Sequence, residues 1–385
     1  MSKYSIFLEK KPLFYKKIDY DRMPKIWQKI KSNFSLPKII HIVGTNGKGT
    51  TGRFLSWYLL KSGYQVGHYS SPHILAFNER IWLNGKDSKE CKLQEAHEFL
   101  LKILDKDDIE ALSYFEYTTL MAIYLFQECD YAIMEAGMGG EFDATNVFDK
   151  IVSLVTTIDI DHQDFLGNSI EEIAYTKLRS ITNVAIVGTQ TNDIVYQVAK
   201  ILQEENGILI KKYTDFIDEY DKIEAKKLSE KKGWPNFLKD NLLLSISAIK
   251  FLDIKLKYEY FEDIELFGRF QKIKDNIIVD VGHNTLAAKK IKEMFKDKKI
   301  ILIYNSYKDK KYKMILQILK PIIKRVEILK INSPRVEKEN ILQNVLNDLD
   351  IENKFFKNID EKENYLVFGS FSVVEEFLKG YMLER

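Results

Sequence analysis

The stretch that most constrains this chain covers residues 38–63, KIIHIVGTNGKGTTGRFLSWYLLKSG. Its apolar, β-branched run at 39–43 predicts a buried strand. The glycine-rich segment 44–51 predicts a turn, and the apolar spacing after it predicts a helix that stops at Gly63. Strand, glycine loop and helix in this order form the arrangement that binds phosphate groups.

The residues within the loop suit that chemistry. Glycines let backbone N–H groups converge on an anion, and the start of a helix adds a favourable dipole. Lys48 would neutralise the outer phosphates, and a hydroxyl at Thr50 or Thr51 could reach Mg²⁺.

The spacing departs from the common pattern G-x-x-x-x-G-K-[ST]. Only two residues separate Gly44 from Gly47, and Gly49 stands between Lys48 and the first threonine. A tight glycine turn without a ligand therefore remains an alternative for this loop.

Composition limits the class of protein. A chain of 385 residues is too long for one typical core, so we expect two domains. The 45% hydrophobic and 30% charged residues are typical of a soluble globular protein. A net charge of +2 argues against a nucleic-acid-binding surface.

The two cysteines and the N-terminus bear on location. Cys91 and Cys129 lack metal-ligand spacing and fit a reducing compartment. Charged residues follow Phe7 and Leu8 at once, so a signal peptide is not expected. No run approaches the roughly 20 apolar residues of a membrane span. We expect a cytoplasmic protein without membrane contact.

Strands and helices alternate after the loop, which predicts a doubly wound, mostly parallel sheet. A helical pattern over 1–36 precedes the loop. Further strands are predicted at 65–69, 131–136, 151–157, 184–187 and 208–211, and helices at 113–127, 170–181, 194–205 and 236–251. Charged residues fill 213–234, which predicts exposed strands or a loop.

A charged and aromatic segment at 253–266 is a predicted linker, so the expected domains are 1–262 and 263–385. The second domain is predicted to be a smaller, Rossmann-like α/β domain. Its predicted strands lie at 277–281, 299–304, 325–331 and 365–368, and its helices at 286–295, 312–322, 338–346 and 373–379.

Polar residues follow three predicted strands. Ser71 lies just after one strand, Glu135 ends another, and His162 follows a third. Ligands of open α/β sheets bind at the carboxyl ends of strands, so these residues are candidates for metal or phosphate chemistry. Loop chemistry for Ser71 and a structural role for His162 remain alternatives.

Several motifs occur in order over residues 18–284: GTNGKGT, YSSPH with FNERI, YFEY, E-x-G-x-GG with DATN, D-H-x-D-F-L-G, FGRFQ and D-x-GHN. In this combination the chain resembles the folylpolyglutamate synthase/dihydrofolate synthase family, within the Mur-type ATP-dependent amide ligases. It departs from the usual family pattern at Glu141, at Leu178-Arg179 and at Thr285.

The resemblance implies roles for individual residues. The residues expected to contact ATP are Gly44, Thr45, Asn46, Gly47, Lys48, Gly49, Thr50, Asn241, Arg269, Asp280 and His283. The expected Mg²⁺ ligands are Ser71, Glu135 and His162, and the expected pterin contacts are Ser113, Phe115 and Asp143. The expected catalytic residues are Lys48, His162, Lys177 and Arg269, and Lys177 falls where similar enzymes carry a carbamylated lysine.

The activity implied by the resemblance is ATP-dependent addition of L-glutamate to dihydropteroate, to folyl-(poly)glutamate, or to both. An acyl phosphate would form first, with one or two Mg²⁺ ions, and ADP and phosphate would be released. We expect a monomer whose partners are these small molecules. Two alternatives remain: a Mur-type ligase acting on another carboxylic acid, and a non-catalytic ATP-binding switch module.

Overall fold

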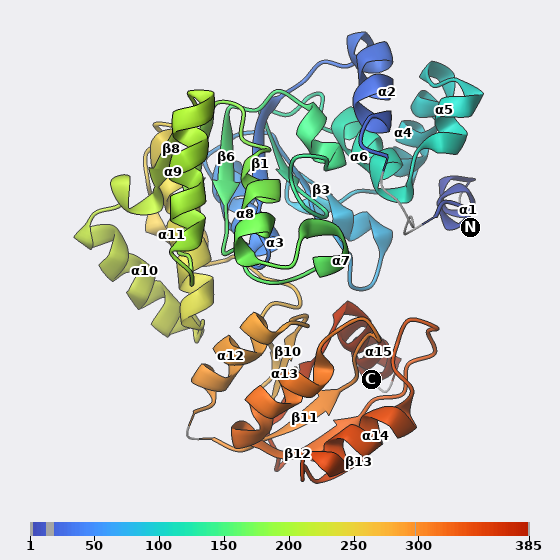
Figure 1. The fold of residues 1–385 in the computed structure, drawn as a ribbon, viewed down its shortest axis with the longest axis vertical. Helices are drawn as coiled ribbons and strands as arrows, with labels where there is room; N and C mark the ends of the chain where they lie inside the picture. The colour runs from blue at the N-terminus through green and yellow to red at the C-terminus, as the bar shows by residue number, and fades with distance from the viewer. Residues whose placement is uncertain (1–2, 13–18, 297, 384–385) are drawn as a thin grey trace. The chain divides into compact units, whose positions relative to one another are not determined.

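The computed structural model describes residues 3–12, 19–296 and 298–383. Its chain packs as two units (Figure 1). The first contains the described residues up to Lys232 together with Leu238–Ile264, and the second contains Gly233–Phe237 and the described residues from Glu265 onward. The expected domain boundary at residue 262 stays a prediction.

An eight-stranded sheet forms the centre of the first unit, in the order β4-β3-β2-β5-β1-β6-β7-β8. All neighbouring pairs are parallel except β2 with β3 and β3 with β4. The predicted doubly wound, mostly parallel sheet is thus confirmed. Its strands are β1 (Lys38–Val43), β2 (Val66–Tyr69), β3 (Ile81–Leu83), β4 (Lys86–Asp87), β5 (Tyr131–Glu135), β6 (Val152–Val155), β7 (Val184–Val187) and β8 (Leu209–Lys212).

Helices cover both faces of this sheet (Figure 1). The longer ones are α2 (Arg22–Ile30), α3 (Lys48–Lys61), α4 (Glu90–Ile103), α6 (Tyr114–Leu125), α8 (Ile170–Leu178), α9 (Ile194–Asn206), α10 (Glu219–Lys232) and α11 (Asn236–Phe251). The shorter ones are α1 (Lys3–Glu9), α5 (Lys106–Ala111) and α7 (Gln163–Leu166). No helix in the described ranges is long and apolar enough to cross a membrane.

The central strand β1 shows how the core is arranged. Side chains alternate along a strand, so Ile39, His41 and Val43 share one face. Ile39 belongs to an apolar cluster with α2, α4 and α6, whereas Val43 belongs to a second cluster with α8 and α9. On the other face α3 packs against β1, β2 and β5. Helix α3, which follows the phosphate loop, therefore packs on the central strands of the sheet.

One prediction for the end of this unit is wrong. Residues 213–234 form a 3₁₀ turn, Tyr213–Asp215, and helix α10, not strands or a loop. Asp221, Ala225 and Leu228 of α10 are buried, so a helical spacing was present but sparse among charged residues. The predicted linker 253–266 contains the division between the two units, after Ile264. Its part in the first unit is packed: Phe261 and Ile264 are buried, and the Tyr58 hydroxyl donates to the Lys255 carbonyl at 2.7 Å.

The second unit contains a six-stranded sheet in the order β13-β12-β11-β14-β10-β9, parallel except for β9 against β10. Its strands are β9 (Gln271–Lys274), β10 (Ile277–Asp280), β11 (Ile300–Tyr304), β12 (Ile323–Ile328), β13 (Asn353–Phe355) and β14 (Tyr365–Phe368). Its helices are α12 (Thr285–Met294), α13 (Tyr312–Leu319), α14 (Glu339–Asp348) and α15 (Phe371–Leu383). This is the predicted smaller, Rossmann-like α/β fold.

Candidate nucleotide and acid site

Two glycines of the loop between β1 and α3 occupy places that no other residue fits. Gly44 has a φ of 144°, and a Cβ there would lie 2.0 Å from Thr156 Oγ1. Gly47 has a φ of 94°, and a Cβ there would lie 2.4 Å from Asn241 Oδ1. The loop thus packs tightly against Thr156, directly after β6, and against α11, and Asn241 lies beside the start of α3.

The first half of the loop is fixed by the end of β6. The Thr45 and Asn46 N–H groups donate to the Thr157 carbonyl at 2.9 and 3.2 Å. The second half opens helix α3 at Lys48. The first N–H groups of a helix have no partner within it, so those of Lys48, Gly49 and Thr50 suit an anion.

Lys48 lies over its own loop. Its Nζ donates to the Gly44 and Thr45 carbonyls at 3.2 and 3.4 Å, and lies 3.9 Å from Glu135 Oε1. Glu135, at the end of β5, is only 4% exposed. Its Oε2 accepts a hydrogen bond from the Ser71 N–H at 3.3 Å. The structure therefore brings Lys48, Glu135 and Ser71 together.

His162 lies at the start of α7, with a φ of 49°. Its Nε2 is 3.9 Å from Asp161 Oδ2, and its side chain is 37% exposed. Within residues 3–12, 19–296 and 298–383, no three His, Cys, Asp or Glu side chains form a group that could hold a metal ion. The role of His162 as a metal ligand stays a prediction.

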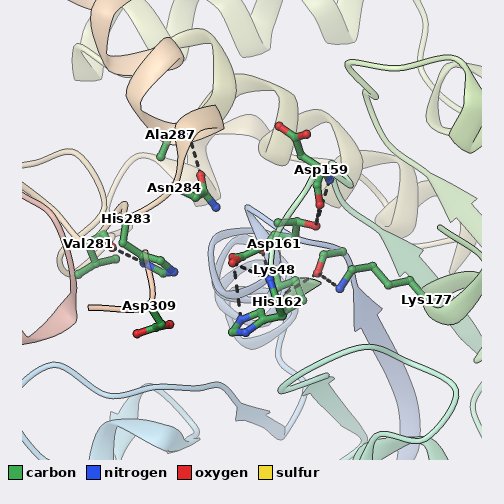
Figure 2. Close-up of polar contacts among 12 residues, drawn as sticks. Lys48, Asp159, Asp161, His162, Lys177, Val281, His283, Asn284, Ala287 and Asp309 are labelled. Atoms are coloured by element: carbon green, nitrogen blue, oxygen red, sulfur yellow. Dashed lines mark hydrogen bonds and ion pairs between the residues drawn. The ribbon is translucent and has the colours of Figure 1, made fainter. Parts of the chain in front are cut away.

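Lys177 of α8 also contacts the phosphate loop. It is 4% exposed, and its Nζ donates to the Gly44 carbonyl at 2.9 Å (Figure 2). The pKa of Lys177 is lowered to about 7, chiefly by burial and in part by the Lys48 cation. Asp161 and Asp143 act in the opposite direction.

The three residues expected at the pterin site lie around one turn. Asp143 accepts hydrogen bonds from the Met138 N–H at 3.0 Å and from the Gly137 backbone. The ring of Phe115 covers Gly137, where a Cβ would lie 2.6 Å from its Cζ. Ser113 caps α6, accepting from the Glu116 N–H at 3.1 Å. The structure thus brings Asp143 and Phe115 to the same Gly137-Met138 turn, and Ser113 to the helix that carries Phe115.

Arg269, Asp280 and His283 belong to the second unit. Arg269 Nη1 donates to the Phe267 carbonyl at 2.9 Å. Asp280, at the end of β10, accepts from the Phe270 and Gly282 N–H groups at 2.9 and 2.8 Å. The pKa of Asp280 is raised to about 6 by burial, against the opposing effects of the Gly282 and Phe270 N–H groups and of Arg269. His283 Nδ1 lies 3.1 Å from the Val281 carbonyl (Figure 2).

Some residues around the loop were not expected from the sequence. Asp161 lies beside His162 and acts on Lys177 through its charge. Glu141 and Arg179, both departures from the family pattern, face each other at 3.7 Å. The acidic run around His162 could have indicated Asp161, but nothing in the sequence pairs 141 with 179.

Comparisons with known proteins decide the family. A family model described as the Mur ligase middle domain matches residues 42–272. The dihydrofolate synthase/folylpolyglutamate synthase of Haemophilus influenzae is 30% identical over 98% of this chain and 96% of its own length. The chain belongs to the dihydrofolate synthase/folylpolyglutamate synthase family.

Solved structures agree with this membership. Helicobacter pylori folylpolyglutamate synthetase is 38% identical with a TM-score of 0.79, covering 99% of this chain and 98% of that one. The structure of E. coli FolC in complex with DHPP and ADP is 26% identical with a TM-score of 0.82, covering 99% and 97%. The resemblance read from the motifs and the ligase class are therefore confirmed, and a non-catalytic switch module is not favoured.

Proposed function

We propose that this chain uses ATP to join L-glutamate to dihydropteroate and to folyl-(poly)glutamate. The observation that carries the proposal is the position of Lys48 Nζ, over its own phosphate loop and 3.9 Å from the buried Glu135. The family's names supply the acid and the amino acid. The complex of E. coli FolC with ADP and DHPP supports a nucleotide and a pterin as ligands of one protein.

The reaction proceeds in two steps. A carboxylate oxygen of the acid attacks the γ-phosphorus of ATP, the bond to ADP breaks, and an acyl phosphate forms. The glutamate amine then attacks the acyl carbon, phosphate leaves, and the amine loses a proton. Little covalent chemistry falls to the protein, so its residues bind, orient and neutralise charge. Lys48 and the first N–H groups of α3 would bind the phosphates.

The oxygen donors beside Lys48 fit Mg²⁺. Hard cations prefer carboxylate and hydroxyl oxygens, and Mg²⁺ usually keeps only one or two carboxylates. Glu135, Ser71 and Thr50 would hold the ion, and His162 would be a less typical ligand. When bound, Mg²⁺ would neutralise charge that develops on the transferring phosphoryl group.

We further propose that Lys177 is carbamylated. Carbamylation needs a neutral amine, and burial lowers the pKa of this amine to about 7. Lys48 repels the protonated amine, and that repulsion would become attraction once the side chain carries a carboxylate. Lys177 would then act as an anion beside the phosphate loop.

The remaining residues are assigned by unit. In the first unit Asn241 would contact the nucleotide, because it packs against Gly47, and Ser113, Phe115 and Asp143 would form the acid side. In the second unit Arg269, Asp280 and His283 would contribute to nucleotide binding. Asp280 accepts hydrogen bonds from the Phe270 and Gly282 N–H groups and thereby fixes the backbone directly after Arg269.

Release of ADP tests this assignment. We expect sustained ADP release when ATP, Mg²⁺, L-glutamate and a pterin acid are all present, and a slower rate or none when either organic substrate is omitted. The proposal would be contradicted if the rate of ADP release did not depend on the pterin acid and rose instead when another carboxylic acid was added.

A further inference from the structure

His41 is a polar residue in the middle of β1, a strand that is buried at every position after Lys38. It is fully buried on β1, and its neighbours on the same face are Ile39 and Val43. These two residues belong to separate apolar clusters, so His41 lies between them. A polar ring in such a place costs stability unless its polar atoms are engaged. Its partner therefore indicates why a histidine stands there.

The partner is the hydroxyl of Thr145, itself fully buried. His41 Nε2 lies 2.8 Å from Thr145 Oγ1, and that hydroxyl donates to Asp143 Oδ1 at 2.6 Å. A hydroxyl has one proton, so Thr145 can donate to Asp143 only while it accepts from His41. The ring must then carry its proton on Nε2. The Asp143 carboxylate, which can only accept, thus sets the direction of both hydrogen bonds, and His41 supplies the N–H that this direction requires.

Asp143 links this pair of hydrogen bonds to the turn at Gly137-Met138. Its Oδ1 also accepts from the Thr145 N–H at 3.0 Å, and its Oδ2 accepts from the Met138 N–H at 3.0 Å. The ring of Phe115, which belongs to α6, packs against Gly137 of the same turn. The chain His41, Thr145, Asp143 therefore ends at the turn around which the proposed acid-side residues lie.

We propose that His41 is a positioning residue for the acid substrate, which acts through the Thr145 hydroxyl to fix the Asp143 carboxylate and the Gly137-Met138 turn. This inference rests on the proposed function, because it takes Asp143 and Phe115 as part of the acid side. It adds a residue that touches neither substrate nor nucleotide.

The charge state of the ring agrees with this role. Burial lowers the pKa of His41 well below its ordinary value, and the nearby Lys150 lowers it further. The ring is thus neutral near pH 7, with one N–H to donate. Nδ1 has no hydrogen-bond partner among the residues that the structure describes, so the second nitrogen does not compete for the proton.

The test compares variants that keep or lose each donor. His41→Leu and Thr145→Val remove a donor, whereas His41→Gln and Thr145→Ser keep one at a similar reach. We expect His41→Leu and Thr145→Val to raise KM for dihydropteroate about tenfold, the size of one hydrogen bond to a charged group, with KM for ATP unchanged. His41→Gln and Thr145→Ser should restore most of the loss.

A matched control separates positioning from stability. His97 is also buried, and its Nδ1 lies 2.8 Å from the Tyr117 hydroxyl. His97→Leu should lower the melting temperature as His41→Leu does, but leave the ratio of the two KM values at the wild-type level. If both variants change the KM values alike, or if the His41→Leu effect persists in an Asp143→Asn background, the inference is wrong.

A second readout does not depend on ligase activity. The protein has six histidines, so ¹⁵N-labelled histidine gives few ring signals, and His41→Gln identifies one of them. We expect this ring to be the neutral Nε2–H form near pH 7. A proton on Nδ1, or a charged ring, would overturn the inference even if the protein ligates glutamate. Failure of ligation with an Nε2–H ring would instead contradict the proposed function.

Discussion

Lys177 donates a hydrogen bond from Nζ to the carbonyl oxygen of Gly44, 2.9 Å away, although 133 positions separate the two residues. The contact ties the last turn of α8 to the first residue of the phosphate loop. It also places a buried amine beside Lys48, which is why the pKa of Lys177 falls to about 7. An amine in this position is costly to protonate.

Stability should therefore depend on pH through Lys177. Its pKa is about 7 when folded and 10.5 as an ordinary lysine. Between these values the unfolded chain binds more protons, so the free energy of unfolding should rise with pH from about 7 to 10.5 and be lowest below pH 7. Lys177→Met should flatten this rise and stabilise the protein at neutral pH.

Urea denaturation in bicarbonate-free buffer at several pH values measures this effect. Lys200→Met is the control, because Lys200 of α9 is 77% exposed. A rise of equal slope in wild type and Lys177→Met would show that the Lys177 amine is protonated as easily in the folded chain as in the unfolded one. Adding ¹³C-bicarbonate to the wild type should then produce a carbamate signal that Lys177→Met lacks.

Lys48→Ala should abolish ligation without unfolding the protein. Its ammonium contacts loop carbonyls and Glu135, not the apolar core, so little packing is lost. Losing one preorganised charge at the transferring phosphoryl group typically lowers kcat by about 10²–10³. Turnover and melting curves check this, with Lys61→Ala at the other end of α3 as control. Near-normal turnover in Lys48→Ala would contradict the phosphate-loop assignment.

Glu135→Gln should raise the Mg²⁺ concentration needed for half-maximal turnover. The change removes a charged oxygen donor but keeps the shape, so the backbone contact to Ser71 can persist. His162→Ala should have a similar but smaller effect, since imidazole is not a typical Mg²⁺ ligand. Titrating Mg²⁺ at saturating ATP measures both. An unchanged requirement in Glu135→Gln would make that carboxylate a structural partner of Lys48.

Arg269→Ala should lower kcat more than it weakens nucleotide binding. A guanidinium contributes most where charge develops, that is, during phosphoryl transfer. Turnover and ADP affinity, measured side by side, separate the two effects. The control is Arg335→Ala, also in the second unit, whose guanidinium lies over the ring of Tyr307. Equal losses in turnover and affinity would reduce Arg269 to a nucleotide contact.

Local sequence patterns predicted much of the fold. The run at 39–43 and the glycines after it predicted β1, the loop and α3, because each depends on near neighbours. Helix α10 was missed because its four buried positions lie among lysines and glutamates. The packing of 253–266 was missed because it depends on Tyr58 and Trp57, about 200 residues earlier.

The site divides in the same way. Ser71 and Glu135 were predicted from strand ends, and adjacent parallel strands do bring them together. The relation of Lys177 to Gly44 depends on how α8 packs, which no local pattern gives. His41 was visible as a polar residue in an apolar strand, but its link to Asp143 appears only once Thr145 is placed.

Mass spectrometry of the reaction products tests the central claim most directly. The protein is incubated with ATP, Mg²⁺, L-glutamate and either dihydropteroate or tetrahydrofolate, and Lys48→Ala serves as the control. We predict that each acid gains the mass of one glutamyl residue in the wild-type reaction, with one ADP formed per residue added, and that neither does so with Lys48→Ala. Consumption of ATP without a glutamylated pterin, or the same product from Lys48→Ala, would contradict the account.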